Sequence, residues 1–173
     1  AIEHEKRLMA PIAATADMII DTSRLKSAEL RKILQDQFAI GEKDAMAIFV
    51  KSFSFRQGVP GEADLVFDVR FLRNPHYDPE LRLLTGLDDR VGAYIEKDQD
   101  FTGFMDRLKG LIGPVLPRYA QEGKSYLTIA IGCTGGQHRS VYIARMLNDW
   151  IAGLGYDVHL SHRDKPDEPK PGE

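Results

Sequence analysis

The sequence predicts an α/β fold, in which a helix-strand-helix remnant precedes a three-layer domain with a largely parallel sheet. Two observations predict the domain. Apolar runs rich in β-branched and aromatic residues alternate with segments of helical spacing, and the last strand-helix-strand unit has the length of a parallel crossover. A third observation predicts the remnant, because residues 1–40 hold one short strand with nothing after it to pair with.

The chain is expected to divide into three segments. Residues 1–42 are expected to be the end of a larger domain, and the opening on Ala1 rather than Met suggests a fragment. Within that segment the spacing predicts a helix, a strand and a helix at 3–16, 17–23 and 27–38. A complete domain is expected over 43–163, followed by a disordered tail at 164–173 that is rich in proline and charge.

The domain is expected to contain four strands and two long helices. Dense β-branched and aromatic residues predict strands at 47–55, 63–72, 125–133 and 156–163. Apolar residues three and four apart predict helices at 101–119 and 140–153, the first weakened or kinked by Gly110, Gly113 and Pro114. Ligands of parallel sheets bind beyond the carboxyl ends of strands, where 68–78 and 132–140 fall.

The overall composition limits the classes of function. Of 173 residues, 28% are charged and 43% hydrophobic, which is typical of a soluble globular protein. A net charge of −3 counts against an obligate RNA or DNA binder. The single Cys133 excludes an internal disulfide and a cysteine-rich zinc site, so we expect a cytoplasmic protein without a metal. No apolar run approaches the roughly 20 residues that span a bilayer, so no membrane partner is expected.

The segment IGCTGGQHRS, from Ile131 to Ser140, is predicted to be a strand-to-helix loop that holds a phosphate-like anion. Its glycines, Gly132, Gly135 and Gly136, allow backbone angles that side chains forbid and let N–H groups converge on a ligand. The helix that opens near His138 adds the positive end of its dipole. The loop lacks the Lys-Ser or Lys-Thr pair of a Walker A motif, so ATP binding here does not follow.

The side chains of this loop also suit an anion. Thr134 and Ser140 can donate hydroxyl hydrogen bonds, Arg139 can hold two oxygens, and His138 can supply charge or a proton near neutral pH. The alternative is that the glycines only make a tight turn while Arg139 pairs with a surface carboxylate. The combination of glycines, hydroxyls, Arg and His at one helix start favours the anion site.

Cys133, five residues, Arg139 and then Ser140 also match the spacing of cysteine-dependent phosphatases. In that alternative the thiolate attacks phosphorus while Arg139 holds the phosphate, and Asp68 is a speculative general acid. A buried structural cysteine is the preferred interpretation, in which no residue of the chain is catalytic.

A second polar cluster follows the strand expected at 63–72. Asp68 and Arg70 would share one face of that strand, with Arg73, Asn74 and His76 in the exit loop. Arg70 could contact a ligand or simply pair with Asp68, and these alternatives stay open. His76 could be only a packed turn residue. Arg56, after the first strand, could be a further cation or a solvated surface residue.

Three segments of the chain, SFSFRQGVP, ADLVFDVRFLRNPHYDPELRLLTGLD and SYLTIAIGCTGGQHRSVYIA, closely resemble the C-terminal half of the bacterial RapZ (YvcJ-type) family. The resemblance covers about residues 45–163. The earlier segment EKRLMAPIAATADMIIDTS looks like the end of that family's N-terminal P-loop kinase-like domain.

The resemblance implies that an N-terminal half upstream of Ala1 binds and hydrolyses ATP or GTP, with no cofactor expected in this fragment. It implies a C-terminal half that senses glucosamine 6-phosphate, binds small regulatory RNA and presents it to an RNase, in a homo-oligomer. The family's loop corresponds to Gly132–Ser140, and its Asn-Pro-His turn to 74–76. The expected ligand-binding residues are Gly132, Cys133, Thr134, Gly135, Gly136, His138, Arg139, Ser140, Arg70, Asn74 and His76.

Two departures from the family affect the expected RNA binding. Gln137 stands where a lysine is common, and the tail DKPDEPKPGE mixes signs where RNA-binding members end in a basic run. Because phosphate contacts supply much of RNA affinity, weak RNA binding is expected. The leading hypothesis is therefore a regulatory domain that binds a phosphorylated metabolite or a nucleotide phosphate. An RNA adaptor that uses Arg56, Arg70, Arg73 and Arg163 is the second hypothesis, and a phosphatase is the third.

Overall fold

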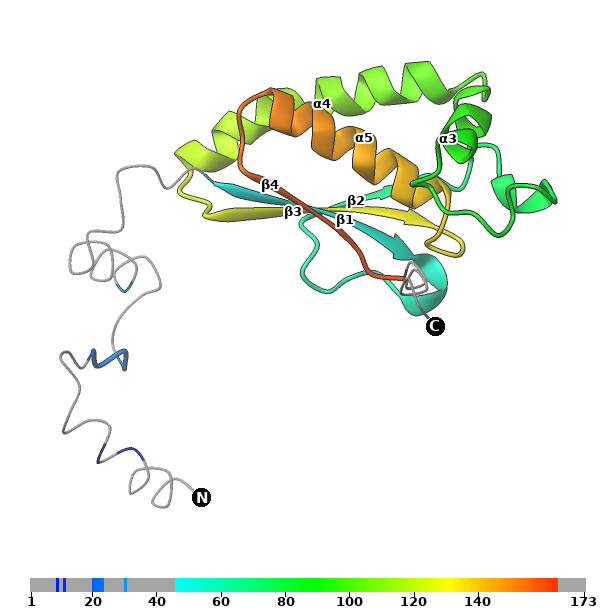
Figure 1. Ribbon diagram of the computed structural model, residues 1–173. Coiled ribbons are helices and arrows are strands. Elements are labelled where there is room, and N and C mark those ends of the chain that lie inside the picture. The colour runs from blue at the N-terminus through cyan, green and yellow to red at the C-terminus, as the bar shows by residue number, and fades with distance from the viewer. Residues whose placement is uncertain (1–8, 10, 12–19, 24–29, 31–45, 165–173) are drawn as a thin grey trace. The chain divides into compact units, whose positions relative to one another are not determined.

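The computed structural model describes the second of two units into which the chain divides, Ala1–Lys43 and Asp44–Glu173 (Figure 1). The described residues are 46–164, together with Met9, Pro11, 20–23 and Leu30. Apart from these few positions, the helix-strand-helix expected within 1–42 lies outside the described residues, and so does the disordered tail expected at 164–173 except for Asp164. Asp164 itself is placed and contacts the domain.

Four parallel strands form one sheet, which confirms the α/β fold with a parallel sheet. The strands are β1 (Ala47–Ser54), β2 (Leu65–Asp68), β3 (Tyr126–Cys133) and β4 (Val158–His162), in the order β2-β3-β1-β4. The two central strands pair along their whole length, with Ser54 opposite Cys133, and Asp68 lies opposite Gly132. The carboxyl ends of three strands thus meet at one edge.

The connections contain three α-helices among the described residues. They are α3 (Asp89–Glu96), α4 (Phe101–Gln121) and α5 (Arg139–Gly153). The prolines of α4, at 114 and 117, do not end it. The short α3 was not expected, although Asp88 caps it by accepting a hydrogen bond from the Arg90 N–H. No helix in the described part of the chain has the length and apolar character needed to cross a membrane.

Both long helices cover the same face of the sheet (Figure 1). Parallel crossovers are right-handed, and those from β2 to β3 and from β3 to β4 run in one direction across the sheet. Their helices must therefore share a face. The connection from β1 to β2, residues 55–64, runs in the opposite direction and therefore crosses the other face of the sheet. It contains only a 3-10 turn, and Phe49, Val66 and Tyr126 on that face are exposed. The described residues thus build two layers instead of the expected three.

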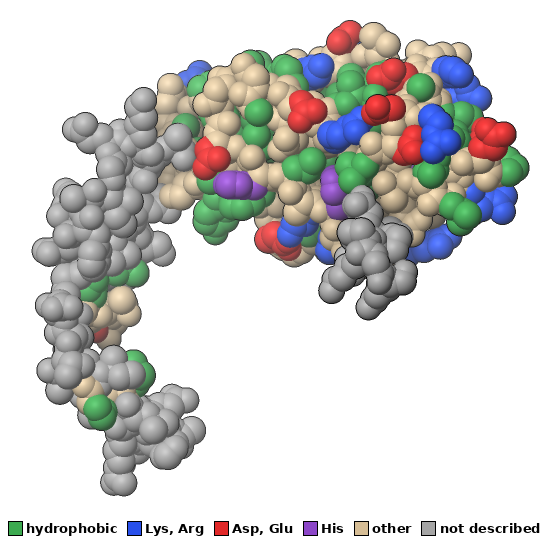
Figure 2. Space-filling model, viewed as in Figure 1, with side chains coloured by type: hydrophobic (Ala, Val, Ile, Leu, Met, Phe, Trp, Pro, Cys, Tyr) green, Lys and Arg blue, Asp and Glu red, His purple; other side chains and the backbone are tan. Residues whose placement is uncertain are grey.

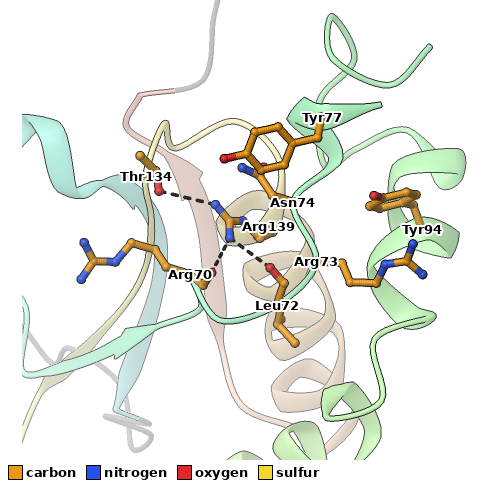
Figure 3. A pocket seen from close by; sticks show the side chains of 8 residues that line it. All are labelled: Arg70, Leu72, Arg73, Asn74, Tyr77, Tyr94, Thr134 and Arg139. Atoms are coloured by element: carbon orange, nitrogen blue, oxygen red, sulfur yellow. Dashed lines mark hydrogen bonds between the residues drawn. The ribbon is translucent and has the colours of Figure 1, made fainter. Parts of the chain in front are cut away.

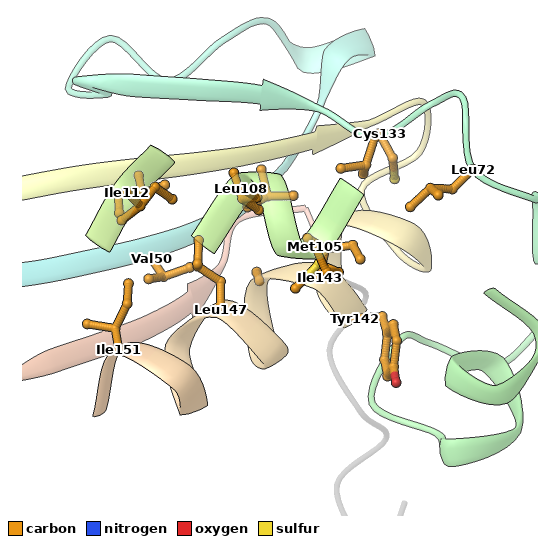
Figure 4. Packing of buried hydrophobic residues seen from close by; sticks show 14 of the residues in the cluster. Val50, Leu72, Met105, Leu108, Ile112, Cys133, Tyr142, Ile143, Leu147 and Ile151 are labelled. Atoms are coloured by element: carbon orange, nitrogen blue, oxygen red, sulfur yellow. The ribbon is translucent and has the colours of Figure 1, made fainter. Parts of the chain in front are cut away.

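The core lies between the sheet and these two helices (Figure 4). Val50 of the sheet packs with residues of α4 and α5 that are spaced three and four apart, and all are almost fully buried. The residues are Leu108, Ile112, Ile143, Leu147 and Ile151. This packing fixes α5, and with it the loop that joins β3 to α5.

β2 ends at Asp68, four residues before the expected end of the strand. The Val69 N–H still donates to Gly132 O at 2.9 Å, but the Asp68 carboxylate then accepts the Arg70 N–H and turns the chain. The prediction that Asp68 and Arg70 share a strand face was therefore wrong, because Arg70 lies in the turn that follows.

Leu147→Ala should lower the free energy of unfolding by about 2–5 kcal/mol, because it opens a cavity in the fully buried core. Leu154→Ala is the matched control, since Leu154 caps the same helix and is 49% exposed; its cost should be near 0.5 kcal/mol. Urea unfolding measures both, and equal costs would contradict this packing.

Candidate functional site

Two adjoining cavities open at the carboxyl edge of the sheet. The smaller cavity, of about 430 Å³, is lined by Arg70, Leu72, Arg73, Asn74, Tyr77, Tyr94, Thr134 and Arg139 (Figure 3). The larger cavity, of about 790 Å³, is lined by Ser54, Arg56, Gln57, Asn74, His76, Tyr77, Cys133, Thr134, Gly135, Gln137, His138, Arg139 and Asp164. Arg139 and Thr134 belong to both, so the two cavities share a polar wall.

Arg139 is held by backbone carbonyls rather than by a carboxylate. Its Nη1 donates to Arg70 O at 2.5 Å and to Leu72 O at 3.0 Å, and its Nη2 lies 3.5 Å from Thr134 Oγ1 (Figure 3). The residue is only 4% exposed, forms no salt bridge within the described residues, and its Nε has no acceptor there. Among the described residues, Arg139 therefore has no surface carboxylate as a partner, in contrast to the alternative considered from the sequence.

Burial without an anionic partner disfavours the charged form of Arg139. Desolvation accordingly lowers the pKa of its guanidinium, and the nearby Cys133 and Asp68 oppose this effect. A buried positive charge is costly unless an anion and hydrogen-bond acceptors compensate it. Because Arg139 lines both cavities, an anionic ligand bound there would compensate this charge.

The loop before α5 uses its glycines for different purposes. Only Gly136 has a positive φ, +71°, so the expectation of special backbone angles holds for one glycine of three. Gly132 instead makes room, because a Cβ there would lie 2.5 Å from the rings of Phe53 and Phe55. Gly86 was not expected to matter; its N–H donates to Gln137 O, and a Cβ would lie 2.2 Å from His138 O. Gly86 therefore lets its own segment pack closely against the loop.

Cys133 stands at the base of the loop as the last residue of β3. Its Sγ accepts the Gly136 N–H at 3.2 Å and lies 3.1 Å from Ser140 Oγ. Cys133 is 3% exposed, as a structural cysteine would be, although it lines the larger cavity. Both contacts would also stabilise a thiolate.

Asp68 lines neither cavity. Arg70 donates to its carboxylate through Nε and Nη2, with the shortest contact at 2.6 Å. These hydrogen bonds lower the pKa of Asp68, which keeps the carboxylate charged and unsuited to donate a proton. The geometry therefore gives no support to Asp68 as a general acid for Cys133.

His138 is the N-cap residue of α5 and faces the larger cavity. It is 7% exposed, and its Nε2 has no hydrogen-bond partner among the described residues. Burial lowers the pKa of the imidazole below its usual 6.5, so the ring is neutral at pH 7. The neutral imidazole adds no charge to the cavity, and the neighbouring backbone of Leu81, Arg82 and Leu84 opposes the lowering of its pKa.

The second polar cluster meets the loop, as expected, at this edge of the sheet. The pairing of Arg70 with Asp68 is confirmed, and its guanidinium also lies 4.2 Å from the centre of the Phe55 ring. Asn74 Oδ1 accepts the His76 N–H and caps the 3-10 helix Pro75–Tyr77. His76 faces the larger cavity, while Asn74 lies on the wall between the two.

Most of the residues expected from the sequence come together here. Those that line a cavity are Arg70, Asn74, His76, Cys133, Thr134, Gly135, His138 and Arg139. Gly132, Gly136 and Ser140 shape the loop without lining either cavity. Two lining residues were not expected from the sequence, Tyr94 of α3 and Asp164, whose carboxylate accepts the Ser54 N–H at 2.6 Å. Asp164 follows β4, and the rule that strand ends meet at one edge could have identified it.

Two of the arginines proposed for RNA contacts already form hydrogen bonds or salt bridges within the domain. Arg163 donates to Ser54 O, Gly58 O and Asp164, and Arg70 is paired with Asp68. Lys and Arg side chains are interspersed with Asp and Glu on the face shown in Figure 2. That face of the described residues does not present one continuous basic surface of the kind that binds nucleic acid.

Comparison with known proteins gives two family matches. Residues 46–166 match the RapZ C-terminal domain, and residues 1–42 match the RapZ-like N-terminal domain. A nucleotide-binding protein of Rhodospirillum rubrum is 52% identical over 166 residues, which cover 96% of this chain and 52% of the relative. One from Bacillus cytotoxicus is 48% identical over 163 residues, 94% of this chain and 55% of the relative. The chain spans about half the length of these curated relatives.

His138→Gln should make the free energy of unfolding less dependent on pH below about pH 6.5. The folded-state pKa is lowered, so the unfolded chain binds more protons as the pH falls, and the folded state loses stability. This effect amounts to at most about 1.4 kcal/mol per pH unit. Urea unfolding between pH 7 and 5 measures the slope.

The matched control for this measurement is His159→Gln, which removes an imidazole whose side chain is 54% exposed. Its slope should stay close to that of the parent chain. A slope in His138→Gln as steep as that of the parent chain would show that His138 is not buried in its neutral form.

Proposed function

Because the chain belongs to the RapZ family, we propose that its C-terminal domain is a regulatory binding domain for a phosphorylated metabolite or a nucleotide phosphate. The observation that carries the proposal is Arg139, a residue that is 4% exposed and has no carboxylate partner within the described residues. An isolated buried charge costs several kcal/mol, which an anionic ligand offsets. Occupancy of the site is the signal that the domain relays.

The proposed phosphate position lies beside the Arg139 guanidinium and the first N–H groups of α5. The first N–H groups of a helix have no acceptor within it, and the helix dipole makes this end positive. Thr134 supplies a hydroxyl on the same wall, and the neutral His138 lines the larger cavity at the start of the helix. Together these donors suit the several oxygens of a phosphate group.

The rest of the ligand would extend through the shared wall into both cavities. Their volumes, about 430 and 790 Å³, suit a phosphorylated sugar or a nucleotide. Tyr77, which is 79% exposed, and Tyr94 offer rings to a sugar face or a base. Within these classes the family resemblance favours glucosamine 6-phosphate, while the relatives are named nucleotide-binding proteins.

The remaining roles rest on the resemblance alone and are part of the same proposal. ATP or GTP hydrolysis would belong to an N-terminal half upstream of Ala1. Assembly into a homo-oligomer and presentation of RNA to an RNase would belong to the whole protein. A gel shift across salt concentrations tests RNA binding directly, because phosphate contacts weaken steeply as salt increases.

Arg139→Ala should weaken the binding of glucosamine 6-phosphate and of inorganic phosphate at least tenfold, because the buried cation is lost. Arg118→Ala is the matched control, since it removes an exposed arginine of α4 that lines neither cavity. Isothermal titration calorimetry measures both. Arg139→Lys separates charge from geometry, because lysine keeps the charge but loses the planar donor pair. Unchanged affinity in a folded Arg139→Ala chain would contradict the proposal.

We also propose a second function, a cysteine-dependent phosphatase, which one observation favours. The 3.1 Å contact between Cys133 Sγ and Ser140 Oγ places a hydroxyl donor where it would stabilise a thiolate. The thiolate would attack phosphorus and displace the alcohol, and water would then release phosphate from the thiophosphate intermediate. Asp68 is not used in this scheme.

Cys133→Ser should abolish turnover of an aryl phosphate if the chain is a phosphatase, while phosphate binding measured by calorimetry persists. Release of nitrophenol from p-nitrophenyl phosphate is the measurement. Turnover that survives in Cys133→Ser, or an absence of turnover in the parent chain, excludes the phosphatase and leaves the binding function intact.

A further inference from the structure

The two cavities differ in the charge of their linings. The smaller cavity is lined by three arginines, Arg70, Arg73 and Arg139, and by no Asp or Glu of the described residues. The lining of the larger cavity includes the carboxylate of Asp164. A concave surface that carries charge of one sign attracts ligands of the opposite sign. How strongly the smaller cavity attracts anions depends on which of its three arginines already have an anionic partner.

Arg70 and Arg73 differ in this respect. Arg70 forms a salt bridge with Asp68, in which Nη2 and Oδ2 are 2.6 Å apart. Arg73 forms no salt bridge within the described residues, and its guanidinium makes no hydrogen bond to them. Its guanidinium carbon instead lies 4.6 Å from the centre of the Tyr94 ring. Stacking on a ring orients a guanidinium without using its N–H groups, so the side-chain donors of Arg73 stay available to a ligand.

One peptide group fixes the backbone of Arg73 relative to Arg139. This group joins Leu72 to Arg73. Its carbonyl accepts a hydrogen bond from Arg139 Nη1 at 3.0 Å, and its N–H donates to Asp98 Oδ2 at 2.7 Å. The same hydrogen bond that holds Arg139 therefore also holds the start of the Arg73 side chain. A ligand that contacts both arginines then loses less free energy in ordering them.

The two guanidinium groups lie at separate positions on the wall of the smaller cavity. Figure 3 shows Arg139 beside Thr134, while Arg73 extends toward Tyr94 of α3. A ligand that contacts both therefore needs two anionic groups with a spacer between them. Tyr77 and Asn74 line the same cavity and offer a hydroxyl and an amide to a polar spacer.

From this we infer that the smaller cavity is a second anion subsite, formed by Arg73, and that the preferred ligand is a sugar bisphosphate. One phosphate group would lie at Arg139 and the start of α5, so the inference rests on the proposed function. The other would accept charge-assisted hydrogen bonds from the Arg73 guanidinium. The smaller cavity, of about 430 Å³, has room for this second phosphate group and the sugar carbons next to it.

Two sugars that differ by one phosphate group test the second subsite. The parent chain should bind glucose 1,6-bisphosphate about tenfold more tightly than glucose 6-phosphate, since hydrogen bonds to a charged group contribute this much. Arg73→Ala should reduce the ratio of the two affinities to about threefold or less, because the second cation is lost. Isothermal titration calorimetry at about 0.15 M salt measures both affinities while screening exposed charges.

Arg118→Ala is the matched control variant, because it removes an exposed arginine outside both cavities and should keep the preference of the parent chain. Pyrophosphate is the matched control ligand, since its two phosphate groups have no spacer between them. Its affinity should fall less in Arg73→Ala than that of the bisphosphate. An equal fall would contradict two separate positions, because Arg73 would then act only through its general positive charge.

The role of the Tyr94 ring has its own pair of variants. Tyr94→Phe keeps the ring on which Arg73 stacks and should keep most of the preference for the bisphosphate. Tyr94→Leu removes the ring and should lose most of it. The same calorimetric ratio measures both. Equal preference in the two variants would show that the ring does not position Arg73.

The outcomes separate this inference from the proposed function. A parent chain that binds both sugars equally would overturn the second subsite and leave the proposed function standing. An Arg73→Ala chain that keeps the full preference would do the same. Binding of both sugars that survives in Arg139→Ala would overturn the proposed function, and the inference with it. A parent chain that binds neither sugar would also overturn both.

Discussion

The burial of Arg139 is the constraint on which the rest of the site depends. An arginine that is 4% exposed and unpaired within the described residues carries a solvation cost that its hydrogen bonds to Arg70 O and Leu72 O relieve only in part. The fold tolerates this cost because α5 and the turn after β2 are fixed by the core. We therefore propose that an anionic ligand completes the site.

The topology explains how residues from distant parts of the sequence reach this position. Parallel pairing of β2, β3 and β1 brings Asp68, Cys133 and Ser54 to one edge, and the loops that follow those strands form both cavities. Right-handed crossovers place α4 and α5 together on one face. The turn after β2 then contacts Arg139 through its carbonyls, while Phe71 of the same turn lines a groove beside α4.

The sequence predicted much of this, because strand ends and glycine-rich turns have strong local signals. The four strands, both long helices and the loop from Gly132 to Ser140 all have such signals. Other features depend on tertiary contacts. The buried state of Arg139, the close packing at Gly86 and the early end of β2 require knowledge of neighbours far away in the sequence. The number of layers also depends on the connection at 55–64. Because this connection contains no α-helix, one face of the sheet has no helix packed on it.

The most direct test is the structure of crystals grown with phosphate or glucosamine 6-phosphate. We expect density for the phosphate group within hydrogen-bond distance of the Arg139 guanidinium and the first N–H groups of α5. Density for the ligand elsewhere would contradict this expectation. An Arg139 paired with a carboxylate of the protein itself would contradict it equally.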